Sequence, residues 1–474
     1  MKRPSRLIGL LAKPVIIASV VGCFSFFGLA DQIAGFSANL GDRDRIVRWS
    51  AVLSGATRDA VPVTLIDIDA AAMARLGHPQ RAPRDMVAGL VALAAAKGAS
   101  GIFLDMDTSQ PGMPAGDQAL LAFVSAYPGD APPLALARRL GPAEPAGNRE
   151  ETLAEQPSIL DAAVRGRANI LWATSISRID EDRVVRRWEL SQTFCAPDGG
   201  RTLPSPQLFA AAVASAQPRP LSDIQAFAAA RTRAICGAGT AAAASPAPSP
   251  SPAPSPIPNP TWPRNPDQRA AIPFLIADGP DLAAPQFIRR DGRNVPLFRR
   301  VSARALMTPA GTVVAARAVA DDLLRDRFVI IGASHAESMD GHLTPIGFLP
   351  GALIVANAVA TAPAVLSGQP LGAAGATLIA LALFGALMAI TSRLRALAAS
   401  VVVAVAVLGS LLALGRIFAP STAGDIVLAA LGMVAFLSTL DGLFTLGKDW
   451  RTRGWRALLK PGKPRAAQGT EDVA

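Results

Sequence analysis

The chain combines two kinds of hydrophobic pattern. Long apolar runs with very few charges lie near its two ends, and short apolar stretches separated by polar residues fill the region between them. Each long run is long enough to cross about 30 Å of hydrocarbon as a helix. The pattern therefore predicts four transmembrane helices, one before the central region and three after it. They are residues 13–30, 371–390, 397–414 and 424–446.

Basic residues indicate how these helices are oriented. Four of them lie before or at the start of the first run, and Arg393 and Arg395 lie between the second and third runs. Because cytoplasmic loops carry an excess of Lys and Arg, residues 1–12 and 447–474 are predicted to be cytoplasmic and residues 31–370 extracytoplasmic. A cleaved signal peptide is the alternative for the first run, although that run is longer than the usual apolar core of about 7–15 residues.

Charge and composition agree with a membrane protein. Charged residues make up 17% of the chain, below the roughly 25% of a soluble domain. Residues 1–30, 391–396 and 447–474 together hold 13 basic and 3 acidic residues, which accounts for the formal net charge of +10. This charge reflects membrane orientation and contact with the lipid bilayer. We expect no nucleic-acid partner, because that would need a basic stripe on a folded domain.

The central region has the pattern of one α/β domain with a mixed sheet. Two short apolar runs, Val63–Ile68 and Gly101–Asp105, flank the helical spacing of Arg84–Lys97, which predicts a β-α-β unit with parallel strands. Four acids would then lie at the carboxyl edge of the sheet, where open α/β sheets bind ligands. They are Asp67, Asp69, Asp105 and Asp107. Further predicted elements are strands at Asn169–Ile176, Val184–Leu190 and Phe328–Ile331 and helices at Ser205–Ala214 and Ala352–Leu366.

Two local features complete the central region. The proline-rich segment 245–260 can form neither a core nor a sheet ladder, so it is predicted to be a disordered, exposed insertion. Cys195 and Cys236 are the only cysteines predicted to lie outside the membrane and the cytoplasm. In an oxidising compartment we expect them to form a disulfide; two independent buried thiols are the alternative.

The stretch Val61–Met106 resembles the opening of type-2 CHASE domains, the extracytoplasmic sensor modules of bacterial membrane receptors. The shared features are acidic strand ends, a Leu-Gly step, a Pro-Arg pair and a Gly-Ala step before the second strand, here at residues 67, 69, 76–77, 83–84, 98–99 and 105. The block Phe328–Leu371 is also similar, with Asp340, His342 and an Ala-Asn-Ala step at 356–358 before the first of three membrane helices.

The resemblance covers roughly residues 31–446 and implies a sensory, receptor-like protein for an unknown small molecule or envelope ligand. Relatives often carry tryptophans beside the Pro-Arg pair and a histidine before the Ala-Asn-Ala step, where this chain has Val355. Relatives also usually continue into a cytoplasmic output domain, whereas the tail here is 447–474. We therefore expect no enzyme activity and a separate cytoplasmic signalling protein as partner. An envelope-structural or assembly factor that docks another periplasmic protein is the alternative.

The candidate ligand-binding residues are all polar. They are Asp67, Asp69, Arg84, Asp105, Asp340 and His342. The acids could bind a cation or a cationic ligand, or they could cap helices and pair with Arg84. Asp340 and His342 could orient a ligand or form a hydrogen-bonded turn. We expect no metal and no cofactor, because the histidines lack zinc-ligand spacing, and the nucleophile motif of a hydrolase is missing.

The predicted membrane helices contain one acid near their cytoplasmic end. Asp441 interrupts the last run, and it is either functional within the membrane, as in a membrane enzyme or transporter subunit, or directed to the cytoplasmic surface. Glycines recur in the three C-terminal runs. Small residues allow close helix packing, either within one bundle or across a homodimer.

Overall fold

The computed structural model describes most of residues 60–367. The gaps are 143–152, 176, 180–182, 197–198, 216–219, 237–268, 273, 275, 277–286, 291, 336–337 and 339, and a few isolated positions follow residue 377. The chain divides into two units, and the described domain belongs to the unit Gly35–Leu371 with Leu411–Gly424. In the part of the chain that is described, no helix is long and apolar enough to cross a membrane. The four predicted spans and segment 245–260 lie outside the described residues, apart from those isolated positions.

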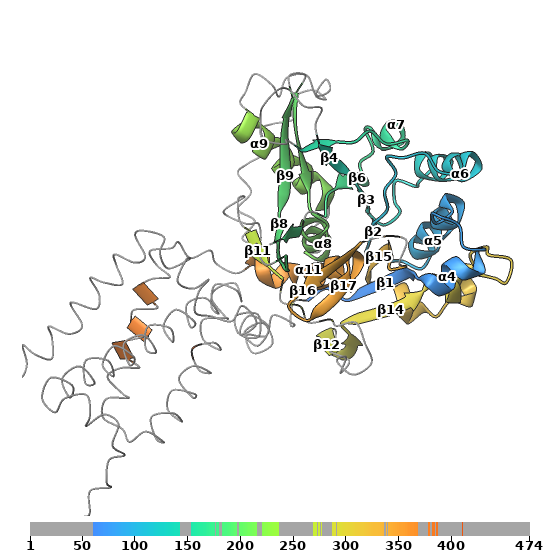
Figure 1. Ribbon diagram of the computed structural model, residues 1–474. Coiled ribbons are helices and arrows are strands. Elements are labelled where there is room, and N and C mark those ends of the chain that lie inside the picture. Colours follow the sequence, from blue (N-terminus) through green and yellow to red (C-terminus); the bar gives the residue numbers. More distant parts are fainter. Residues whose placement is uncertain are drawn as a thin grey trace, which may run out of the picture. The chain divides into compact units, whose positions relative to one another are not determined.

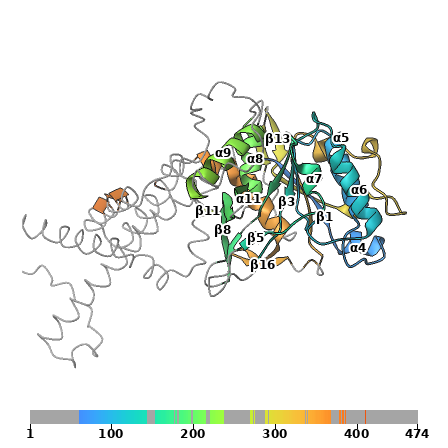
Figure 2. The ribbon, with the colours of Figure 1, turned by 90° about the horizontal axis from the view of Figure 1, so that it is seen from above.

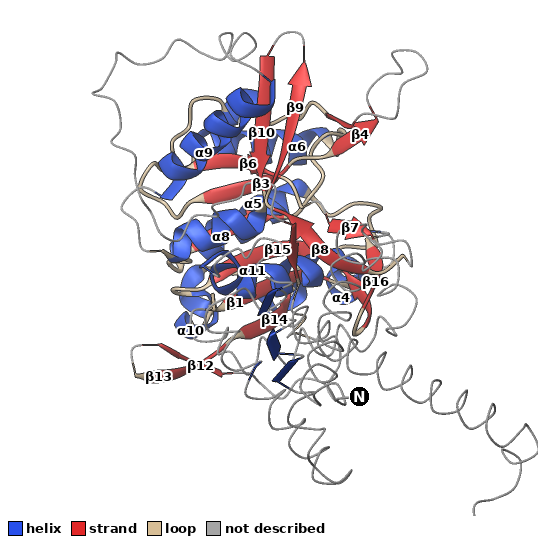
Figure 3. Cartoon of the chain, turned by 90° about the vertical axis from the view of Figure 1, so that its left-hand side faces the viewer, coloured by secondary structure: helices blue, strands red, loops and turns tan. Residues whose placement is uncertain are grey.

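A six-stranded parallel sheet forms the centre of the domain, with the strand order β14-β1-β15-β2-β3-β6. Figure 3 shows these strands stacked from β6 to β14. Their bounds are Phe298–Ser302 (β14), Val63–Ile68 (β1), Phe328–Ala333 (β15), Gly101–Leu104 (β2), Leu134–Ala137 (β3) and Ile170–Ala173 (β6). The predicted mixed sheet is wrong for this sheet, since all its neighbouring strands are parallel. The antiparallel pairs form separate small sheets.

Helices cover both faces of the sheet, which explains why the inner strands are apolar throughout. All six residues of β1 are buried, and alternate side chains enter two different cores. One core contains Leu65 and the helices α8 (Pro206–Ala214) and α11 (Gly351–Ser367). The other contains Ile66 and the helices α5 (Arg84–Ala96) and α6 (Pro114–Ser125). Figures 1 and 2 show these two helical layers with the strands between them.

Smaller elements surround these layers. The remaining strands are β4 (Leu140–Pro142), β5 (Leu153–Glu155), β7 (Ser177–Ile179), β8 (Val185–Glu189), β9 (Ser191–Ala196), β10 (Gly199–Pro204), β11 (Arg269–Ala271), β12 (Phe287–Arg290), β13 (Arg293–Pro296), β16 (Gly341–Thr344) and β17 (Gly347–Pro350). The remaining helices are α4 (Ala70–Arg75), α7 (Asp161–Val164), α9 (Pro220–Cys236) and α10 (Asp321–Leu324), with 3-10 turns η2 (Ala303–Leu306) and η3 (Ala316–Ala318).

The strands and helices predicted from local pattern are confirmed, with shifts of a few residues at their ends. Ser205, predicted as the first residue of a helix, is the N-cap of α8 and accepts a hydrogen bond from the main-chain N–H of Leu208. The predicted β-α-β unit is also present, but β15 inserts between its two strands. β3, α6 and β14 were not predicted. The sequence of β14, FRRVS, lacks an apolar run because this strand lies at the edge of the sheet.

The long helix α11 runs antiparallel to the strands. At its start, a Cβ on Gly332, near the carboxyl end of β15, would lie 2.7 Å from the Cβ of Ala352. Towards its other end, the carbonyl of Ala360 accepts a hydrogen bond of 3.0 Å from the N–H of Val61, just before β1. The helix therefore crosses the domain from the carboxyl edge of the sheet to the amino edge.

The predicted disulfide between Cys195 and Cys236 is confirmed. It joins β9 to the last residue of α9, and the two Cα atoms are 5.4 Å apart. Gly200 lies opposite Cys195 in the β9–β10 ladder, and a Cβ there would come within 2.7 Å of the Cys236 sulfur. A glycine at this position therefore leaves room for the bridge.

Candidate functional site

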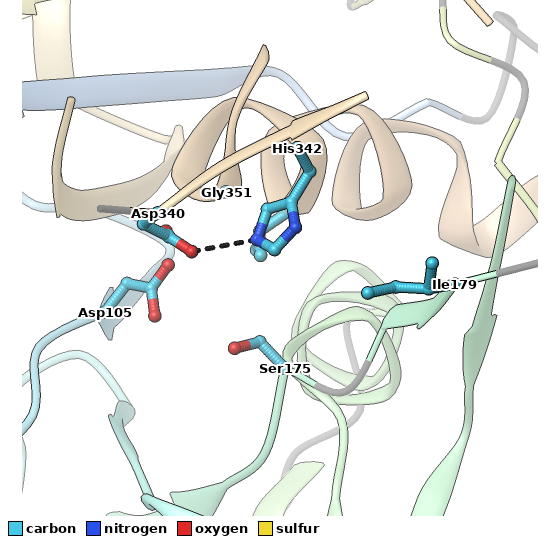
Figure 4. Close-up of a pocket in the computed structure, with 7 residues that line it drawn as sticks. Asp105, Ser175, Ile179, Asp340, His342 and Gly351 are labelled. Carbon is cyan, nitrogen blue, oxygen red and sulfur yellow. Dashed lines mark hydrogen bonds and ion pairs between the residues drawn. The ribbon is translucent and has the colours of Figure 1, made fainter. Parts of the chain in front are cut away.

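A pocket of about 210 Å³ opens at the carboxyl edge of the parallel sheet. It is lined by Asp105, Ser175, Ile179, Asp340, His342, Gly351 and Val355. Asp105 directly follows β2, and Ser175 lies two residues beyond β6. The opposite wall comes from the start of α11 and from β16, and Ile179 belongs to β7. In Figure 4 the Asp105 carboxyl, the Ser175 hydroxyl, the His342 ring and the Ile179 side chain point toward one shared space.

Asp105 is the most perturbed acid in the pocket. Its N–H donates to the carbonyl of Ile331 in β15, which fixes its main chain at the sheet edge. Burial of its carboxyl group, assisted by the nearby carboxylate of Asp340, raises its pKa to about 7. Within the described residues no hydrogen bond or ion pair compensates this carboxyl group. Asp105 therefore changes its protonation state close to neutral pH.

Asp340 lies at the amino-terminal end of α11. Its carbonyl accepts a 2.6 Å hydrogen bond from the N–H of Gly351, the first residue of the helix. A Cβ on Gly351 would overlap the Asp340 carboxylate, so only glycine permits this close approach. A negative charge at a helix N-terminus is favourable, because the unpaired N–H groups there carry partial positive charge. The helix terminus is thus already occupied by an anionic group of the chain.

His342 completes the polar wall through Asp340. Its Nε2 atom is 3.1 Å from Oδ1 of Asp340 (Figure 4). This hydrogen bond raises the pKa of His342, and burial partly opposes the increase. The predicted pair of Asp340 and His342 is therefore present as an interacting pair, in the same pocket as Asp105.

The structure places Asp67 and Asp69 outside this pocket. The carboxylate of Asp67, which is 1% exposed, forms an ion pair of 2.6 Å with Arg300 and accepts a hydrogen bond from the hydroxyl of Ser334. Asp69 is the N-cap of α4 and accepts hydrogen bonds from Ser302 and from the N–H of Ala72. Both carboxylates thus hold strand ends and a helix start together.

Arg84 also lies away from the pocket. Its guanidinium is buried, pairs with Asp117 at the start of α6 and donates to the carbonyls of Asp107 and Gln110. Asp107 in turn pairs with Arg139 at 2.5 Å and is hydrogen-bonded by Ser109. Partial burial raises the pKa of Asp107, but these contacts together outweigh it and lower the pKa. The two residues order the loop between β2 and α6.

Two further candidate chemistries have no site in the described part of the chain. No group of three or more His, Cys, Asp or Glu side chains within it could hold a metal ion. Asp441 lies outside the described residues. The expectations of no metal and of an intramembrane acid therefore remain predictions.

Four pocket residues were not singled out as candidates from the sequence. Ser175 falls at the end of a predicted strand, and the rule that ligands bind at carboxyl strand ends would have selected it. Gly351 follows Pro350, and its Pro-Gly step is typical of a turn or helix start. Ile179 and Val355 carry no local signal, because apolar residues at these positions are equally typical of a core.

The carboxyl edge of a parallel sheet, where this polar pocket lies, is the place at which open α/β domains commonly bind ligands. A sequence model of the CHASE2 domain matches residues 16–390. This match covers most of the chain, which therefore belongs to the CHASE2 domain family, and the resemblance seen in the sequence is confirmed. CHASE2 domains are extracytoplasmic sensor domains. Comparisons with curated proteins and with solved structures give no match.

Proposed function

We propose that this chain is a multi-pass receptor of the bacterial inner membrane. Its CHASE2 domain binds an extracytoplasmic ligand in the pocket, and α11 transmits occupancy to the predicted helices 371–390, 397–414 and 424–446. The chain acts without enzyme activity of its own, and a separate cytoplasmic protein reads the change. The observation that carries this proposal is that α11 begins in the pocket and ends at Ser367, four residues before the start of the first predicted C-terminal span.

The length of α11 supports the relay. Its 17 residues correspond to about 25 Å at 1.5 Å per residue, enough to run along one face of the sheet from its carboxyl edge to its amino edge. Gly351 and Val355 line the pocket, and the carbonyl of Ala360 contacts the chain just before β1. A shift at the pocket would therefore reach both connections of the domain to the predicted membrane segments.

Burial of α11 supports transmission as a unit. Residues 352–362 are all buried. Close-packed protein interiors have low compressibility, so they transmit a displacement instead of absorbing it. Asn357, fully buried, exchanges hydrogen bonds with the main chain of Ile276. The helix is thus held by specific contacts and not only by a smooth apolar face.

The experiment uses the full chain in lipid nanodiscs and a protein-free small-molecule extract of the periplasm. We expect the extract to raise the melting temperature and to change hydrogen exchange in α11, because a ligand that binds only the folded state stabilises it. A Ser175→Trp variant, which fills the pocket, should lose both effects. Met113→Trp is the matched control, because Met113 is 73% exposed and lies outside the pocket, and it should retain both.

The outcomes separate binding from relay. Stabilisation without any change of exchange in α11 would contradict the relay, and an equal response of Ser175→Trp would contradict the pocket. A reporter fused after Ala474 should be active only in the cytoplasm. Activity on the opposite side of the membrane would contradict the proposed topology.

A second candidate is a docking factor for another envelope protein. Leu343 and Phe348 lie opposite each other in the β16–β17 hairpin and are 47% and 69% exposed. Exposed apolar pairs of this kind occur at protein interfaces. Stable co-purification of one envelope protein, lost in a Phe348→Ser variant, together with no response to the extract, would favour this candidate.

A further inference from the structure

We propose that the pocket at the carboxyl edge of the sheet binds a small organic cation: a primary ammonium group on a short aliphatic body. This inference rests on the proposed function, because it names the chemical class of the ligand. It is carried by the juxtaposition of Asp105 with Asp340, Ser175, Ile179 and Val355 in one cavity.

The carboxylates in the pocket disfavour an anionic ligand. Helix N-termini commonly bind anions, but the N-terminus of α11 already holds Asp340. A ligand anion would face the carboxylates of Asp340 and Asp105, whose mutual repulsion already contributes to the raised pKa of Asp105. Neighbouring carboxylates repel each other and any further anion unless a cation lies between them.

A neutral ligand would leave the negative charge of the ionised Asp105 carboxylate without a compensating positive charge. The Asp105 carboxyl has no compensating partner within the described residues, whereas Asp340 has His342. No group of three or more His, Cys, Asp or Glu side chains that could hold a metal ion occurs in the described portion. An ammonium group needs only two or three oxygen acceptors, and Asp105, Asp340 and the Ser175 hydroxyl provide them.

The apolar lining describes the rest of the ligand. Ile179 of β7 and Val355 of α11 contribute aliphatic surface to the cavity wall. In Figure 4 the Ile179 side chain points toward the space above Ser175. A cavity of about 210 Å³ admits a short carbon chain attached to the ammonium group but not a large polycyclic compound.

Binding of such a cation should depend strongly on pH. The titratable groups that face the cavity are Asp105, directly after β2, Asp340, directly before β16, and His342 in β16, and its other lining residues carry no charge. As pH rises through about 7, Asp105 gains a negative charge. His342, whose pKa is raised by its hydrogen bond to Asp340, also loses its positive charge as pH increases, so both changes favour the cation. Binding at lower pH therefore releases protons.

The test uses n-butylammonium as the probe, with n-butanol and butyrate as neutral and anionic controls of similar size. Calorimetry on the full chain in nanodiscs should show binding of the amine alone, about tenfold tighter at pH 8 than at pH 6. Buffers of different ionisation enthalpy should report the released protons. Asp105→Asn should lose binding at least tenfold and become less sensitive to pH. Asp130→Asn, an exposed acid outside the pocket, should match the wild type.

Four results would overturn the inference: no binding of the amine at pH 8, equal binding of butanol or butyrate, amine binding unchanged in Asp105→Asn, or binding of Mg²⁺ in place of the amine. Folding of each variant is checked by its melting curve, and Ser175→Trp provides a second variant that blocks the cavity without changing its charge. If the amine fails while the periplasmic extract still stabilises the protein through the pocket, the receptor proposal stands and only the ligand class is wrong.

Discussion

Asn357 and Ile276 exchange two hydrogen bonds in the interior of the domain. The N–H of Ile276 donates to Oδ1 of Asn357 at 2.7 Å, and Nδ2 of Asn357 donates to the carbonyl of Ile276 at 2.8 Å. Both residues are buried. The amide side chain thus replaces a neighbouring strand for this stretch of main chain and fastens it to the middle of α11.

Replacing Asn357 with Leu should reduce the free energy of unfolding by about 2–4 kcal/mol, because the buried N–H and C=O of Ile276 lose their partners. Urea unfolding of the full chain in nanodiscs, followed by fluorescence of the buried tryptophans, measures this loss. The matched control is Thr361→Val, since among the described residues the hydroxyl of Thr361 bonds only to carbonyls of its own helix, and it should cost less than about 1 kcal/mol. Equal losses in the two variants would show that the Asn357 contacts are not specific.

Asp105 should make the domain less stable as pH rises. Its pKa is higher in the folded state than in the unfolded chain, so its contribution is fully present below about pH 4 and is lost as pH increases through about 7. The limiting slope from this one group is about 1.4 kcal/mol per pH unit. In Asp105→Asn this component should vanish, whereas Asp130→Asn should keep it. Parallel stability curves for the wild type and Asp105→Asn between about pH 4 and pH 8 would contradict the raised pKa.

Gly351→Ala should displace Asp340, because a Cβ at this position overlaps the Asp340 carboxylate. The hydrogen bond to Asp340 is the main cause of the raised pKa of His342, so this variant should return that pKa toward its ordinary value. Titration of the His342 ring by NMR measures the change. Gly129→Ala is the control, since no heavy atom lies within 4 Å of a Cβ placed there. An unchanged His342 titration in Gly351→Ala would show that Asp340 accommodates the extra carbon without moving.

Removing the disulfide should destabilise the domain. The bridge closes a loop with a sequence separation of 41, for which chain-entropy arguments give about 4 kcal/mol. Cys195→Ser and Cys236→Ser should each shift the urea midpoint downward, and reducing agent should have no further effect on either variant. Cys23→Ala should leave the response to reducing agent unchanged. If the wild-type midpoint is insensitive to full reduction, the bridge does not contribute to stability.

Candidate residues differed in how well the sequence located them. Asp105 and Asp340 were both selected, one for its place after a strand and the other for its place in a turn, and they lie in one pocket. Arg84, Asp67 and Asp69 had equally clear signals, yet the structure engages them in ion pairs and a helix cap. Carboxylates at one sheet edge can line a pocket or can stabilise the fold through ion pairs and helix caps. Only the neighbouring side chains distinguish these two roles.

The sequence by itself determined the family and those local elements that have a clear pattern, but not β3, α6 or β14. Burial on both faces makes β1 continuously apolar, α5 carries its helical spacing and Ser205 caps α8, so each can be recognised from a few neighbouring residues. The tertiary structure alone decided that β15 separates β1 from β2, because strand order depends on contacts between segments more than 200 residues apart. It likewise brought Asp105 and Asp340 together and raised the pKa of Asp105. Burial and charge proximity are properties of the packed chain, and no local pattern encodes them.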